Sequence, residues 1–225
     1  MWLNRDADVV EPDYYKEKVS VTNAYAGTVT QCRLNDSKQK GSKSVSLFIE
    51  VTTTDDEVAT EFLTITGKDG NTFYINKKDG SKRQHIGLGT ANTLFLLTLG
   101  KEIFDIEPTN IEYEAYDKEN EEMKTVSGQG FPEMIGKEIG IAVQVTKEGE
   151  GADIKFGTEI QHFFNPVTGT YWNESDKGAG YTRKIDKWIK KAPEYKVIEA
   201  YAPKRSFGGD KKSDTNAGES KGWGR

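Results

Sequence analysis

Alternation of apolar and polar residues dominates the chain and predicts strands. In residues 44–51 every second residue is Val, Leu or Ile, which is typical of a strand with one buried face. Similar reasoning predicts extended structure in five stretches. These are residues 19–34, 44–51, 61–66 with 72–75, 138–146 and 154–164.

Glycine-containing segments mark the turns and bends between these stretches. Gly27 interrupts the first stretch, and a glycine inside a strand indicates a bulge or a sharp bend. The sequence Lys-Asp-Gly-Asn at 68–71 predicts a hairpin that joins residues 61–66 to residues 72–75. Asp79-Gly80 indicates a second turn just after it.

Three stretches, one of them short, are typical of helices. Thr90 is a candidate N-cap, residues 94–99 are mostly apolar, and Gly100 suits the position after a helix end. A helix that is apolar on every face is buried, so we expect this one to fill the core. Residues 183–191 predict a second, amphipathic helix, and residues 131–134 a short one.

The predicted order is three strands, a helix and two strands, which is the layout of the OB-fold. We expect a mainly β protein, an OB-fold-like five-stranded barrel with a helix between strands three and four. An SH3-like barrel or a small sandwich is the alternative. The expected parts are an N-terminal arm (1–18), the OB-fold domain (19–165) with an insertion (101–136) holding an extra hairpin, a C-terminal extension (166–203) and a disordered tail (204–225).

Composition places the chain among globular proteins. Its 24 aromatic residues are too many for a disordered chain, although 30% of residues are charged. No apolar run approaches the roughly 18–20 residues that span a bilayer, and the first residues lack the apolar region of a signal peptide. Cys32 is the single cysteine, so no internal disulfide can form. These features predict a soluble, cytoplasmic protein, in the host cell if it is viral.

The net charge of -5 hides a strong segregation. Residues 204–225 carry six bases and three acids, so their net charge is +3 and that of residues 1–203 is -8. Residues 102–122 hold nine acids and one lysine, whereas lysines gather at 38–43 and 77–83. Three interpretations remain open: an ordinary solvated surface, a basic groove for a polyanion beside an acidic flank, and an acidic patch for a basic protein.

Motifs for catalysis are weak. The chain lacks a phosphate-binding loop, a nucleophile elbow and a dinucleotide fingerprint. Asp153-Ile154-Lys155 matches the carboxylate–lysine pair of metal-dependent nucleases, but such triplets arise by chance in a charged chain. His162 is interpreted as a structural histidine. The sequence therefore predicts a protein that is not an enzyme and needs no metal or cofactor.

Aromatic residues interleaved with lysines are more informative. The alternation that buries Leu47 and Leu63 turns Phe48 and Phe62 to the opposite face of the sheet. There each ring must either be covered by another part of the protein or contact a ligand. Stacking a base on such a ring and holding phosphates with nearby cations is how single strands are bound without sequence reading. The candidate nucleic-acid-binding residues are Lys38, Lys40, Lys43, Phe48, Phe62, Lys68, Tyr74, Lys77, Lys78, Lys82, Arg83 and Tyr113.

Three stretches carry a resemblance to a known family. Residues 65–74 (ITGKDGNTFY), residues 77–80 (KKDG) and residues 94–101 (LFLLTLGK) resemble the single-stranded DNA-binding proteins of tailed bacteriophages. The resemblance covers about residues 19–165. It implies an OB-fold protein of replication and recombination, with Phe48, Phe62, Tyr74 and the neighbouring lysines on its binding face.

The C-terminus departs from that family. Many of its members end in an acidic tail closed by an aromatic residue, which recruits partner proteins, whereas this chain ends Gly-Trp-Gly-Arg on a basic tail. The expected function is to bind and protect single-stranded DNA during phage replication, recombination or repair, with partner proteins docking on the acidic insertion or the tail. A protein–protein adaptor or virion component and a metal-dependent nuclease are the alternatives.

Overall fold

The computed structural model describes residues 17–37, 39–117, 120, 122–149, 154–171 and 183–198. The protein is mainly β, with 50% of these residues in strands and 16% in helices. The strands are β1 (Asn23–Asp36), β2 (Val45–Thr53), β3 (Val58–Thr64), β4 (Phe73–Ile75), β5 (Lys82–Gln84), β6 (Thr109–Asp117), β7 (Glu122–Gly130), β8 (Glu138–Glu148), β9 (Lys155–Phe164), β10 (Thr170–Tyr171), β11 (Arg183–Lys184) and β12 (Lys196–Ile198). The helices are α1 (Ile86–Leu99), α2 (Ile185–Ile189) and the 3₁₀ turns η1 (Ile103–Asp105) and η2 (Pro132–Met134).

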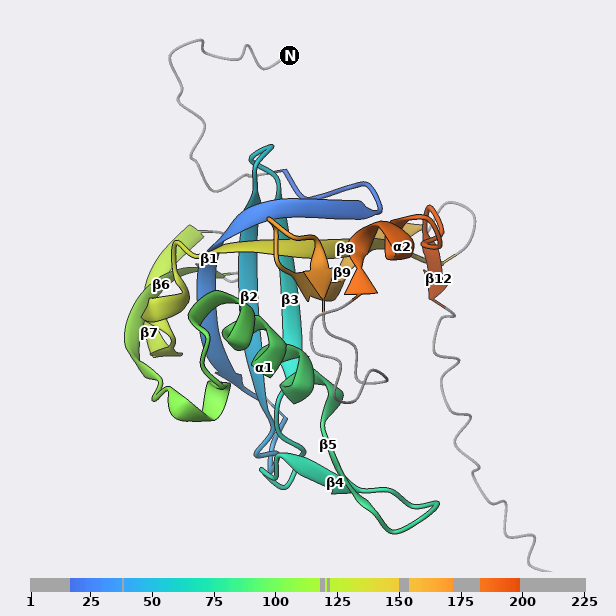
Figure 1. The fold of residues 1–225 in the computed structure, drawn as a ribbon. Helices are drawn as coiled ribbons and strands as arrows, with labels where there is room; N and C mark the ends of the chain where they lie inside the picture. The colour runs from blue at the N-terminus through green and yellow to red at the C-terminus, as the bar shows by residue number, and fades with distance from the viewer. Residues whose placement is uncertain are drawn as a thin grey trace, which may run out of the picture.

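Strand β1 organises the main sheet, whose order is β12-β8-β1-β2-β3 (Figure 1). Residues 23–28 pair with β8 and residues 27–36 pair with β2, so β1 changes partner near Gly27. A Cβ added at Gly27 would lie 2.5 Å from the carbonyl oxygen of Thr52. Glycine is therefore required where β1 bends, and the predicted bend is confirmed, with a register shift between Val29 and Gln31.

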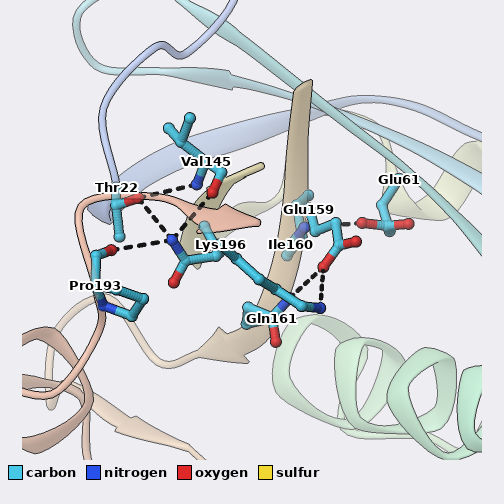
Figure 2. A network of polar contacts seen from close by, with 9 residues as sticks. Thr22, Glu61, Val145, Glu159, Ile160, Gln161, Pro193 and Lys196 are labelled. Carbon is cyan, nitrogen blue, oxygen red and sulfur yellow. Dashed lines mark hydrogen bonds and ion pairs between the residues drawn. The ribbon is translucent and has the colours of Figure 1, made fainter. Parts of the chain in front are cut away.

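The sheet does not close into the predicted barrel. Among the described residues no ladder of hydrogen bonds joins β3 to β9. The carboxylate of Glu61 in β3 instead accepts a hydrogen bond from the backbone N–H of Ile160 in β9, at 2.8 Å (Figure 2). A groove of about 730 Å³ lies beside this link, lined by residues of both strands, by residues 18–22 and by Tyr195. A side chain thus bridges the two strands where backbone pairing was expected.

The predicted hairpin around residues 68–71 is also wrong. After β3 the chain bonds to the start of β2, because Ile65 donates to the carbonyl of Val45 at 2.9 Å and the Thr66 hydroxyl accepts from the Val45 N–H at 2.7 Å. β4 consequently pairs with β5, around the second predicted turn at Asp79-Gly80. This short hairpin is a separate two-stranded sheet that projects from the body (Figure 1).

Helix α1 follows β5, and no helix lies between β3 and β4, so the predicted place of the helix is wrong. The helix begins at Ile86, and Thr90 is no N-cap because its hydroxyl donates to the Ile86 carbonyl one turn earlier. Gly100 ends it as predicted, in a left-handed conformation. Leu94 and Phe95 are fully buried, and the Phe95 ring meets Phe131 edge-on, so the helix fills the core.

The insertion and the C-terminal extension agree more closely with the structure predicted from the sequence. β6 and β7 form the extra hairpin, η2 falls at the predicted short helix, and α2 lies within the predicted 183–191. The predicted tail and most of the predicted arm lie outside the described residues. Among the described residues, no helix has the length and apolar character that crossing a bilayer requires.

Candidate nucleic-acid interface

Four side chains form a row across the outer face of the sheet. Strand pairing places Arg33 of β1 opposite Phe48 of β2, and Phe48 opposite Phe62 of β3. Their chain neighbours Cys32, Leu47 and Leu63 are buried on the inner face. The row therefore arises from the alternation of side chains along three paired strands.

The rings and the guanidinium in this row are in direct contact. The centroids of Phe48 and Phe62 are 4.8 Å apart. The Cζ atom of Arg33 lies 4.2 Å from the Phe48 centroid and 4.2 Å from the centroid of Tyr113 in β6, which are cation–π distances. We call Phe62, Phe48, Arg33 and Tyr113 the aromatic row.

Exposure differs along the aromatic row. Phe62 is 57% exposed, whereas Phe48 is 8% exposed because Phe62 and Arg33 flank its ring. The prediction that both rings leave the core face is confirmed, but only Phe62 presents a large free surface. An exposed phenyl ring supported by a second ring is a flat apolar platform of the kind on which a base stacks.

Polar groups hold Arg33 in place. Its Nε donates to the Oε1 of Gln31 at 3.4 Å, and its Nη1 donates to the Oδ1 of Asn35. The nearby Glu50 carboxylate accepts from the hydroxyl of Thr30 at 2.8 Å. Burial lowers the pKa of Arg33, an effect that Tyr113 and Glu50 oppose. The guanidinium is thus a half-buried, oriented positive charge on this face.

The β4–β5 hairpin carries a group of bases. Lys77 and Lys78 lie exposed in its turn, and the ammonium of Lys82 lies 4.6 Å from the centroid of Phe73. Arg83 forms an ion pair with Asp79 at 2.8 Å. Hydrogen bonds from Ser81 and from Arg83 lower the pKa of Asp79 to about 2, so Asp79 is ionised and offsets the charge of Arg83.

Two further basic segments lie side by side at the end of the sheet. The backbone N–H of Lys43 donates to the carbonyl of Lys68 at 2.9 Å, and a Cβ at Gly70 would lie 3.4 Å from the Cβ of Lys43. Lys40 is exposed in the same loop as Lys43. Lys38 lies outside the described residues.

The structure groups the predicted binding residues into three sets. Phe48, Phe62 and Tyr113 share the aromatic row; Lys43 and Lys68 share the adjacent loops; and Tyr74 lies with Lys77, Lys78, Lys82 and Arg83 on the β4–β5 hairpin. The ring of Tyr74 is 41% exposed and lies 5.5 Å from that of His85 rather than in the row.

Arg33 is the residue that the sequence reasoning missed. It lies between Cys32 and Leu34, and the alternation that turned Phe48 outward applies equally to Arg33. The signal was therefore present. It was weakened by the register shift between Val29 and Gln31, which changes the phase of alternation within β1.

The other candidate chemistry gains no support. Within the described ranges no three His, Cys, Asp or Glu side chains cluster as a metal site, and Asp153 lies outside those ranges. His162 stacks on Tyr171 with ring centroids 4.4 Å apart, beside Trp188. This packing fits the structural role that was predicted for it.

The chain matches no model of a known protein family, and a search of curated proteins also finds no match. The functional conclusion therefore depends on the geometry of the aromatic row and on the basic segments around it.

Proposed function

We propose that this protein binds single-stranded DNA without strong sequence preference, as the single-stranded DNA-binding proteins of tailed bacteriophages do, and protects it during replication, recombination or repair. The observation that carries the proposal is Phe62, an exposed ring on an open sheet face, backed by Phe48 and aligned with the Arg33 guanidinium. Base stacking on such a ring is worth about 1–3 kcal/mol per base.

Unpaired bases are the fitting partner because only they expose their flat faces. In a duplex those faces are stacked inside the helix, and a protein reads the base edges from the grooves. Positive charge comes from Lys43 and Lys68, exposed in adjacent loops before β2 and after β3, and from Lys77 and Lys78, exposed in the turn of the β4–β5 hairpin. Phosphate neutralisation by these lysines would add affinity that is independent of base identity.

We further propose that the fold is an OB-fold left open between β3 and β9. The pairing order β9-β8-β1-β2-β3 supports this relation, since β1 joins a three-strand meander to a two-strand unit. Residues 65–85, with the β4–β5 hairpin, and residues 100–137, with the β6–β7 hairpin, would then be insertions on either side of α1.

The test is a fluorescence titration of the whole chain with labelled oligo-dT and with a duplex of equal length, repeated across salt concentrations. Single strands should bind at least about tenfold more tightly than duplex. With four to six phosphate contacts, log K should fall against log salt with a slope of roughly -3 to -4. Equal affinity for duplex, or a flat salt response, would contradict the proposal.

A further inference from the structure

Arg33 is a half-buried cation that forms no direct ion pair within the described part of the chain. Among the described residues the ion pairs are Arg83–Asp79, Lys124–Glu122 and Lys196–Glu159, and none of them includes Arg33. Removing a charge from water is unfavourable unless an opposite charge or hydrogen bonds compensate for it. Two amide oxygens, Tyr113 and the nearby Glu50 carboxylate compensate for it only in part, because the pKa of Arg33 is still lowered by burial.

The surroundings of Arg33 fix its orientation. Phe48 and Tyr113 each lie 4.2 Å from Cζ, and Gln31 and Asn35 accept from two of its nitrogens. A guanidinium has five N–H donors in one plane. Apart from the side chains of Gln31, Asn35 and Tyr113, Arg33 has no hydrogen-bond acceptor within the described part of the chain. Donors therefore remain for an external acceptor.

The insertion completes this arrangement. Arg33 pairs with Gly130 of β7, and β6 brings Tyr113 to the side of Arg33 away from Phe48. A Cβ at Gly130 would lie 2.7 Å from the carbonyl oxygen of Cys32, so β7 can approach β1 this closely only with glycine there. The β6–β7 hairpin therefore supplies the ring of Tyr113 against which the guanidinium of Arg33 packs.

We propose that Arg33 binds a phosphate of the strand whose neighbouring base stacks on Phe62, a step that rests on the proposed function. Only the ring of Phe48 separates the guanidinium from Phe62, so one nucleotide can reach both. Phosphate is the chemical class that fits, because an oriented guanidinium can donate two parallel hydrogen bonds to its oxygens. Tyr113 is then a positioning residue that acts through Arg33.

The experiment measures the dissociation constant for labelled oligo-dT across salt for four variants: Arg33→Gln, Arg33→Lys, Tyr113→Leu and the control Lys190→Gln. Arg33→Gln should weaken binding about tenfold or more and reduce the salt slope by about 0.7, the value for one phosphate contact on a single strand. Arg33→Lys should keep the slope but not the affinity, because an ammonium cannot make the paired hydrogen bonds. Tyr113→Leu should weaken binding less than Arg33→Gln. Lys190→Gln should change little, since Lys190 is exposed after α2 and belongs neither to the aromatic row nor to the basic segments of the candidate interface.

The outcomes separate this inference from the proposed function. If the unchanged protein fails to bind oligo-dT, the proposed function fails. If it binds and folded Arg33→Gln binds equally well, or loses affinity with no change in salt slope, the phosphate assignment to Arg33 is overturned while the function stands. Melting temperatures identify any variant that does not fold. If Arg33→Gln is such a variant, Arg33→Lys decides, because unchanged affinity would overturn the bidentate contact.

Discussion

Phe62 and Phe48 are neighbours in the aromatic row, but they should respond differently to truncation. Phe62→Ala should weaken oligo-dT binding by about 1–3 kcal/mol, the value of one stacked base, and leave the melting temperature almost unchanged, because the ring is 57% exposed. Phe48→Ala should lower the free energy of unfolding by about 3–5 kcal/mol, since its ring is buried.

Melting temperature and affinity, measured on both variants, check this pair of expectations. A large loss of stability in Phe62→Ala would mean that its ring serves packing. Unchanged affinity of the Phe62→Ala variant for oligo-dT would mean that the Phe62 ring does not contact the DNA, whatever the stability of the variant.

Glu61 should make stability depend on pH. Burial raises its pKa, and Glu159 adds to the effect, while hydrogen bonds from the Ile160 and Phe62 N–H groups oppose it. The folded pKa lies above the unfolded value of about 4.3, so the folded state holds the proton more tightly. The contribution of Glu61 to the free energy of unfolding should therefore fall as pH rises through this interval and level off above the folded pKa.

Chemical denaturation of wild type and Glu61→Gln from about pH 4 to pH 7 tests this sign. The amide can accept only one of the two hydrogen bonds with its single oxygen, so the variant loses the same amount of unfolding free energy at every pH. The difference between the two proteins should favour wild type most at the acidic end. A difference that does not change with pH would contradict the raised pKa.

At the scale of elements, β1 depends on Gly27. Alanine there would place its Cβ 2.5 Å from the Thr52 oxygen and 2.8 Å from the Cγ1 of Val51. Gly27→Ala should therefore lower the free energy of unfolding by about 1–3 kcal/mol or more. Gly157→Ala in β9 is the matched control, because its nearest neighbour is the movable hydroxyl of Thr146 at 3.0 Å. Denaturant titration of both should separate them; equal stability would mean that β1 can shift to accept a side chain.

The β4–β5 hairpin should contribute charge rather than stacking specificity. Replacing both Lys77 and Lys78 by Gln should reduce the salt slope of oligo-dT binding by up to about 1.4, that is about 0.7 for each lost phosphate contact. The exposed pair Lys190 and Lys191, after α2, is the control, and the same double change there should leave the slope unaltered. A reduced slope in the control alone would place the phosphate path on the α2 side.

Elements were predictable where one face of a strand is buried. The alternation in β2 and β8 found these strands because their inner side chains lie in one continuous core. The β6–β7 hairpin was found by the same alternation, although its side chains are only half-buried or exposed. The hairpin at 68–71 was wrong because turn composition does not reveal that Thr66 bonds back to Val45. The start of α1 was wrong because His85 takes the N-cap position without a side-chain hydrogen bond, which leaves no capping signal in the sequence.

At the scale of the whole molecule, the sequence predicted two features least well. These are whether the barrel closes and how the residues of the aromatic row come together. Where the barrel is open, Glu61 reaches across to Ile160, and no local pattern encodes this contact between a side chain and a backbone group far apart in the chain. The aromatic row was found in part, through Phe48 and Phe62. Its link to Arg33 and Tyr113 depends on how the β6–β7 hairpin meets β1, which only the three-dimensional structure shows.

The charge of the C-terminal residues leads to a prediction for the intact chain. Residues 204–225 carry a net charge of +3 and lie outside the described residues. Truncation after Pro203 should weaken oligo-dT binding, most clearly at low salt, because positive charge attracts the phosphate backbone. The melting temperature should stay the same. Tighter binding by the truncated protein would show that these residues compete with DNA.

The two strands that form the long ladders with β1, β2 and β8, are synthesised at different times. β2 follows β1 directly, whereas β8 begins at Glu138, about a hundred residues later. A nascent chain can therefore assemble β1–β2–β3 before β8 has been synthesised, which leaves residues 23–28 without their partner strand. An unpaired strand edge is a template for pairing with another chain. The bend that lets one strand serve two partners thus commits the protein to a late step in folding at which it is open to mispairing.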